Sequence, residues 1–296
     1  MNANVRHIAQ SMSRRVLVPV LALALALVAT PVLAQDGGSQ AKVEELKKTF
    51  AAAMNAAKQG NADEAYPKLE QSLQLANEAE ESGAASQIQD RMITLAKNWG
   101  NKALKDKNYA EAETHFNKGA QYAPDDAYMV YGMGLAQINQ DGKTPDAIQT
   151  LQQAISVAEE NGDRKTAQLA TERIRQEFVS RASKALNVQN PGRSAAEEAL
   201  AALDEMREYV DASEKSLFYR ATALYAQGDH AEAISTAREG LEMHRGSRTS
   251  AAKYHFVIAE SQLQSGDKEA ACAEFEQAAF GDYKARSEHY LENECN

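Results

Sequence analysis

The stretch NYAEAETHFNKGAQYAPDD, residues 108–126, decides the fold of this chain. After a short polar turn, small and aromatic residues recur four and three positions apart at Ala112, Phe116 and Gly119. Residues with this spacing lie on one face of a helix. Pro124 does not continue a helix, and the acidic pair that follows it suits the start of the next one. The stretch therefore predicts a helix that packs by one face and is followed directly by another.

The same arrangement returns along most of the chain. Six polar or glycine-containing turns each lead to a helix start with a small residue that opens a similar triplet. The first members of the triplets are Ala65, Ala112, Ala147, Ala196, Ala233 and Ala271, which are 47, 35, 49, 37 and 38 residues apart. Self-similarity of this period indicates stacked supersecondary units. Since the chain has only six prolines and no strand-like alternation, the pattern is all-α.

This pattern resembles the tetratricopeptide repeat, a helix–turn–helix of about 34 residues. In the best copy, Trp99 and Gly100 fill the large and small positions of the first helix. The resemblance implies helix–turn–helix repeats stacked in a right-handed superhelical solenoid of about six helix pairs with a C-terminal capping helix. The clearest copies are residues 93–126, 127–161, 214–247 and 252–281, and the degenerate ones are 46–77 and 173–210.

The chain is expected to contain four parts. They are a signal peptide (1–34), a flexible leader (35–40), the repeat solenoid (41–281) and a polar capping segment (282–296).

The first segment has the composition of an export signal. Three arginines and no acid precede the apolar run 16–29, and Val32 and Ala34 stand at the positions before a cut. The run is shorter than the roughly 20 residues of a spanning helix, which favours cleavage over an uncleaved anchor. The Leu-rich run favours the general secretory route over the twin-arginine route, which residues 13–17 partly resemble. We expect a periplasmic or secreted protein with no membrane insertion of the mature chain.

The charge of the chain bears on which partners it can bind, and its cysteines bear on its redox chemistry. The chain has 42 acidic and 32 basic residues, so we expect no nucleic acid partner. Cys272 and Cys295 are its only cysteines. In an oxidising compartment they are expected to form one disulfide, and two free thiols are the alternative. Without a C-x-x-C pair, dithiol redox chemistry has no support.

Catalytic and metal-binding motifs are missing from the sequence. It has no H-E-x-x-H, G-x-S-x-G, P-loop or calcium loop. The glycines at Gly132 and Gly134 lack the third glycine of a dinucleotide loop. The histidines are scattered, and His115, just before Phe116, is expected at the surface. We expect no metal, no cofactor and no enzymatic activity.

The candidate site lies in the first helix of each pair. In tetratricopeptide proteins these helices line a concave surface where partners bind. The resemblance therefore implies a partner-binding groove formed by Lys97, Asn101, Lys105, Tyr128, Tyr131, Lys215, Phe218, Tyr225, Lys253 and Phe256. Aromatic anchors with cations suit a peptide or protein segment. The alternative for each aromatic residue is that it packs between repeats.

The carboxylate clamp of some chaperone-binding members is incomplete in this sequence. Lys97 and Asn101 match its first part, but Gly132 stands where the next asparagine is required. The predicted function is a non-enzymatic scaffold or adaptor of the cell envelope that binds a protein or peptide partner. The alternative is a periplasmic small-ligand-binding component associated with a transporter. The sequence leaves the oligomeric state open.

Overall fold

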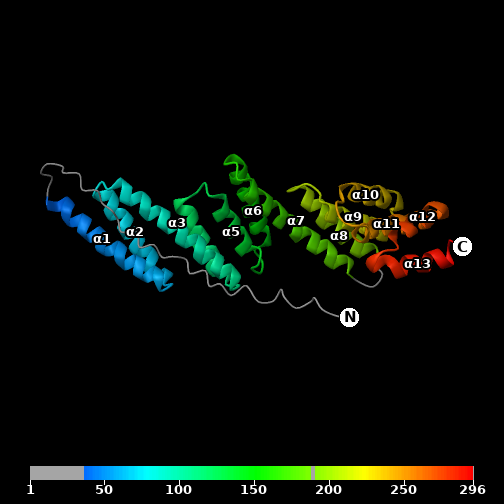
Figure 1. Cartoon of the computed structure of the whole chain (residues 1–296), viewed down its shortest axis with the longest axis horizontal. Helices are drawn as coiled ribbons and strands as arrows, with labels where there is room; N and C mark the ends of the chain where they lie inside the picture. The colour runs from blue at the N-terminus through cyan, green and yellow to red at the C-terminus, as the bar shows by residue number, and fades with distance from the viewer. Residues whose placement is uncertain (1–36, 188–190, 296) are drawn as a thin grey trace, which may run out of the picture. The chain divides into compact units, whose positions relative to one another are not determined.

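A computed structural model describes residues 37–187 and 191–295, which form α-helices, one 3-10 helix and no strand (Figure 1). The expected signal peptide lies outside these residues. The helices are α1 (Gly37–Lys58), α2 (Ala62–Glu78), α3 (Ser82–Lys105), α4 (Tyr109–Tyr122), α5 (Ala127–Gln137), α6 (Thr144–Glu160), α7 (Arg164–Leu186), α8 (Arg193–Arg207), α9 (Glu214–Gln227), α10 (His230–Met243), α11 (Arg248–Gln264), α12 (Lys268–Ala278), η1 (Gly281–Tyr283) and α13 (Lys284–Asn293). The predicted all-α class is confirmed.

The chain forms two compact units, of which the first ends at Met92 and the second begins at Ile93. In the first unit α1 packs against α2, with Leu46, Ala53 and Leu69 fully buried. Helix α1 begins at Gly37, so the prediction of a flexible leader is wrong for residues 37–40, which form its first turn. No proline in this segment prevents the helix from extending toward the N-terminus.

In the second unit each helix from α4 to α12 packs against the next one. The odd-numbered helices also contact each other in series, α5 with α7, α7 with α9 and α9 with α11. We call these four helices, with the part of α3 from Ile93, the inner layer, and α4, α6, α8, α10 and α12 the outer layer. Alternation of this kind is what stacked helix pairs produce.

The triplet of the opening stretch sets the distance between helices. The ring of Phe116, on α4, is fully buried between two glycines. A Cβ atom added to Gly100 of α3 would lie 2.8 Å from this ring, and one added to Gly132 of α5 would lie 2.5 Å from it. Both are closer than real Cβ contacts, so only glycine admits the ring at these crossings. At each of these two crossings, the distance between the helices therefore depends on both the glycine and the Phe116 ring that packs against it.

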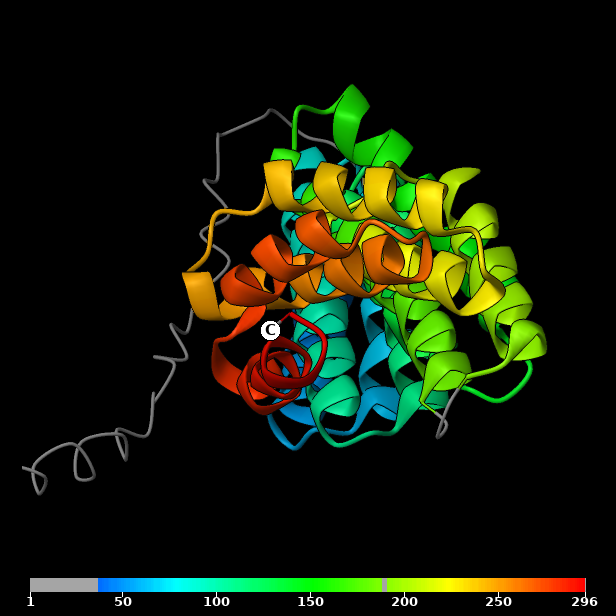
Figure 2. The same ribbon diagram turned by 90° about the vertical axis from the view of Figure 1, so that its right-hand side faces the viewer.

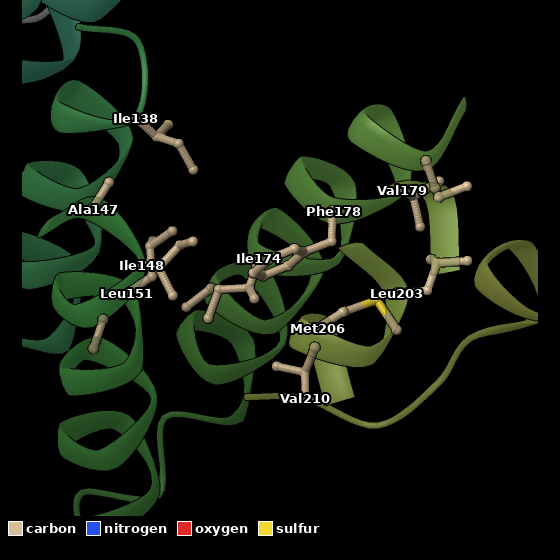
Figure 3. Packing of buried hydrophobic residues seen from close by; sticks show 14 of the residues in the cluster. Ile138, Ala147, Ile148, Leu151, Ile174, Phe178, Val179, Leu203, Met206 and Val210 are labelled. Atoms are coloured by element: carbon tan, nitrogen blue, oxygen red, sulfur yellow. The ribbon is translucent and has the colours of Figure 1, made fainter. Parts of the chain in front are cut away.

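One group of buried residues joins α5 to α9 through α6, α7 and α8. Figure 3 shows its members on α6, α7 and α8. Its large members include Ile148, Leu151, Ile174, Phe178, Leu203 and Met206. Helices α7 and α8 coincide with the degenerate repeat, yet they bury apolar residues as completely as their neighbours do. The core is thus continuous through the segment where the sequence pattern is weakest.

The C-terminal segment covers the last repeat. Helix α13, red in Figure 2, packs against α12, where the rings of Phe275 and Tyr290 stack with centroids 4.4 Å apart. Cys272 of α12 is bonded to Cys295, which follows α13. The predicted disulfide and the predicted capping helix are both confirmed.

His115 corrects a prediction. It is only 5% exposed, although it was expected at the surface. Its ring lies 5.6 Å from the ring of Trp99 on α3, and its Nε2 lies 3.5 Å from Glu111. The indole of Trp99 therefore covers the side of α4 that carries His115, next to the face that carries Phe116. The spacing of residues within α4 cannot reveal a contact made by another helix.

Candidate functional site

Four of the predicted groove residues meet where side chains of α3 and α5 contact one another. The Tyr128 hydroxyl donates a 2.9 Å hydrogen bond to Oδ1 of Asn101. Lys97 Nζ lies 4.3 Å from the centroid of the Tyr128 ring and 3.8 Å from Asp126. The ring of Tyr131 is 6.0 Å from that of Tyr128. We call these residues the α3–α5 cluster.

The α3–α5 cluster is largely satisfied by its own contacts. Asp126 also accepts a hydrogen bond from the Tyr128 backbone amide and so caps α5. Tyr131 is half-buried, and burial raises the pKa of its hydroxyl, with a further contribution from Tyr128. The cluster therefore belongs to the inner layer and also holds neighbouring repeats together. Lys105 lies apart from it, exposed in the last turn of α3, where a cation suits the helix C-terminus.

A cleft of about 500 Å³ opens on α7, α9 and α11. It adjoins a second hollow of about 360 Å³, and the two share Glu172, Ser213, Lys215 and Tyr219. We call the combined hollow the inner cleft. Three predicted residues line it, Lys215, Phe218 and Lys253. Sequence reasoning missed its other lining residues, which are Glu172, Arg175, Gln176, Val179, Ser180, Ser183, Lys184, Ser213, Glu214 and Tyr219.

Most of the missed residues belong to α7. The repeat that contains this helix departs from the spacing of the others, so its inward positions could not be transferred from the family pattern. One signal was present in the sequence, because α7 carries six basic and two acidic residues in an otherwise acidic chain.

The side chains of the inner cleft are held by specific contacts. Lys253 Nζ lies 5.1 Å from the centroid of the Phe218 ring and 3.5 Å from Oε1 of Glu214. That oxygen also accepts a 2.9 Å hydrogen bond from the Tyr254 hydroxyl and lies 2.8 Å from Nδ1 of His244. Burial acts to raise the pKa of Glu214, but these partners outweigh it and hold the pKa below its ordinary value. Glu214 is therefore an ionised and already occupied carboxylate.

Two cations of the inner cleft have no such partner. Lys184 and Lys215 are exposed, and neither makes an ion pair with any described residue. Beside them, the Ser183 hydroxyl donates to the Tyr219 hydroxyl at 3.1 Å, which holds the Tyr219 ring across α7 and α9. The inner cleft thus combines an accessible aromatic wall with unneutralised positive charge.

The structure contradicts the groove prediction for Phe256. This side chain is only 1% exposed, because the rings of Tyr283 and Tyr290 lie 5.1 and 6.2 Å away and Arg286 lies 4.2 Å from its centroid. The C-terminal segment covers the position from which an inner-helix residue would otherwise face a partner. Phe256 therefore belongs to the packing of the cap.

Tyr225 lies near the same cap. Burial, together with the negative charge of Glu260, raises its pKa to about 12. Glu260 itself accepts hydrogen bonds from Arg286 and from the Tyr290 hydroxyl, both at 3.2 Å. The predicted groove residues therefore fall into three places, the α3–α5 cluster, the inner cleft and the region under the cap, with Lys105 apart.

The described residues offer no group of three His, Cys, Asp or Glu side chains that could hold a metal ion. Within the same residues, no helix combines the length and apolarity needed to cross a membrane.

The comparison with known families identifies the repeats. A family model described as "Tetratricopeptide repeat" matches residues 97–164 and 218–285. The chain is a tetratricopeptide repeat protein. The first matched segment of this tetratricopeptide protein includes the α3–α5 cluster, and the second begins at Phe218 in the inner cleft. No curated protein matches the chain.

Two solved structures are similar to this tetratricopeptide protein. One is a tetratricopeptide repeat protein from Parabacteroides merdae, with 14% identity, 86% of this chain and 100% of the other covered, and a TM-score of 0.31. The other is the TPR domain of P58(IPK), with 17% identity, 86% and 79% covered, and a TM-score of 0.27. At these TM-scores neither structure adds to the argument from the repeats.

Proposed function

We propose that this protein is a non-enzymatic scaffold or adaptor of the cell envelope, which holds a peptide segment of a protein partner in the inner cleft. The observation that carries the proposal is the inner cleft itself. It places the aromatic side chains Phe218 and Tyr219 near Lys184 and Lys215, which pair with no acid among the described residues. Aromatic anchors rimmed by charge are typical of protein-binding surfaces.

The location in the envelope is supported by the signal-like N-terminal segment and by the disulfide. Structural disulfides persist in exported proteins and are rare in reducing compartments. The absence of catalytic motifs agrees with the scaffolding role that tetratricopeptide repeats usually have.

Site-specific cross-linking in the producing cells tests the proposal. A photoreactive residue in place of Lys215 reports on the inner cleft, and one in place of Glu239 reports on an exposed position of the outer helix α10. We expect a defined protein adduct from position 215 only, and Phe218→Ala should reduce its yield. Equal yields of adduct from both positions would contradict the inner cleft as the docking site. So would an unchanged yield from position 215 in a folded Phe218→Ala protein.

A small ligand is the second candidate, because about 500 Å³ lies in the size range of ligand pockets. Native mass spectrometry of protein purified from its own cells distinguishes the two candidates. A stoichiometric small mass that Phe218→Ala abolishes would favour the ligand-binding component. Protein without added mass, together with the position-215 adduct, supports the scaffold.

A further inference from the structure

Charge in the second unit is distributed by layer. In the inner layer, α7 has six basic and two acidic residues, and α9 and α11 each have two basic and one acidic. The part of α3 from Ile93 has three lysines and no acid, and α5 has no charged residue. Every inner helix is therefore neutral or positive.

The outer layer has the opposite sign throughout. Helix α6 has three acids and no base, and α8 has four acids and two bases. Helices α10 and α12 each have three acids and one base, and α4 has two acids and one base. Among these helices of the second unit, net positive charge is thus confined to the layer that contains the inner cleft.

Part of this difference in charge is used in ion pairs between the two layers. Arg181 of α7 pairs with Glu205 of α8 at 3.5 Å, and Arg220 of α9 pairs with Asp204 of the same outer helix. These bridges use cations that point toward the outer layer. They do not account for the cations that line the inner cleft.

The cleft cations are only partly neutralised. Of its two acids, Glu214 is occupied by His244, Tyr254 and Lys253, and Glu172 lies 3.7 Å from Arg175. Lys184 and Lys215 are left without an acidic partner among the described residues. A concave site lined by one sign of charge concentrates its field and attracts the opposite sign. The surplus in the inner cleft is positive.

We propose that the inner cleft binds an acidic segment of the partner, with carboxylates at Lys184 and Lys215 and an apolar side chain against Phe218. This inference rests on the proposed scaffold function and adds the chemistry of the partner. The acidic outer layer repels the same segment, so charge directs it to one layer.

A labelled acidic peptide tests the inference directly. An extended peptide of about twelve residues is about 40 Å long, enough to cross three helices packed about 10 Å apart. The probe alternates Asp or Glu with Leu and Gly, and its control replaces each acid by Asn or Gln. Anisotropy with purified, disulfide-intact protein is expected to show binding of the acidic probe only, and weaker binding as salt is raised.

Matched charge variants locate the binding. Lys184→Gln with Lys215→Gln should weaken the acidic probe about tenfold, the loss expected for two exposed charge pairs. Arg238→Gln with Lys268→Gln removes the same charge from exposed positions of the outer helices α10 and α12 and should leave affinity unchanged. Equal losses from the two pairs would show a net-charge effect and overturn the inference.

Two further outcomes also overturn it. One is equal affinity for the acidic and amide probes. The other is a single-stranded oligonucleotide that binds more tightly than the acidic probe, which would indicate a general polyanion site. The proposed function is tested separately from this inference. It requires a protein adduct from position 215, but it does not require the cross-linked segment of the partner to be acidic. An adduct through a non-acidic segment would retain the scaffold and reject only the acidic partner.

Discussion

Replacing Gly132 by alanine tests the reasoning that glycines set the distance between helices. The new Cβ would lie 2.5 Å from two ring carbons of Phe116, and this ring is confined on its other edge by Gly100. Overpacking a core site costs about 1–3 kcal/mol, whereas Gly→Ala in a helix gains up to about 1 kcal/mol. Contacts of 2.5 Å put the cost near the upper end of its range, so we expect Gly132→Ala to lower the free energy of unfolding by about 2 kcal/mol near Tm. In a domain of this size the melting temperature should fall by about 4–8 °C.

A matched substitution separates packing from helix propensity. Gly83 is also in a helix, α3, but an added Cβ would meet nothing within 4 Å. Gly83→Ala should therefore leave stability unchanged or raise it slightly. Phe116→Leu should remove most of the penalty of Gly132→Ala in a double-mutant cycle followed by thermal melts and circular dichroism. A Gly132→Ala protein as stable as its parent, or additive effects in the cycle, would refute the reasoning.

Three further predictions concern the disulfide, a titrating carboxylate and the α3–α5 cluster. Cys272→Ser with Cys295→Ser should destabilise α13 by about 3 kcal/mol, measured as faster hydrogen exchange of its amides with exchange in α7 unchanged. The pKa of Glu214 is lower in the folded state, so this carboxylate stabilises the fold above its unfolded pKa, and the contribution is lost as pH falls through its folded pKa. Glu214→Gln should therefore be less stable than the parent at pH 7, with a difference in urea denaturation that shrinks toward about pH 3. Tyr128→Phe removes the 2.9 Å hydrogen bond to Asn101 and should cost about 1 kcal/mol in urea denaturation without changing the yield of the position-215 adduct.

The fold could be predicted because its determinants are local and repeated. The spacing of Ala112, Phe116 and Gly119 fixes the packing face of α4, and the same spacing recurs in the other outer helices. The burial of His115 could not be predicted in this way. It depends on where Trp99, on a different helix, directs its side chain.

The candidate site could be predicted less completely for the same reason. Lys215, Phe218 and Lys253 could be placed on the inner helices because they hold regular positions in clear repeats, and in the structure they line the inner cleft. Arg175 and Lys184 were missed because α7 belongs to a degenerate repeat that is recognisable only from its packing. Phe256 was wrongly assigned because the cap that covers it is not part of any repeat.

Packing explains one set of residues in this protein and leaves another set unexplained. Phe116, Gly132 and their equivalents are accounted for by the helices that they touch, so they carry no information about a partner. Lys184 and Lys215 touch no acidic group among the described residues, and mutual repulsion disfavours collecting cations on one helix layer. A stacked fold requires small residues at its crossings, but it does not require one sign of charge on each layer. The charge of the inner cleft is therefore the feature on which we base the proposed acidic partner.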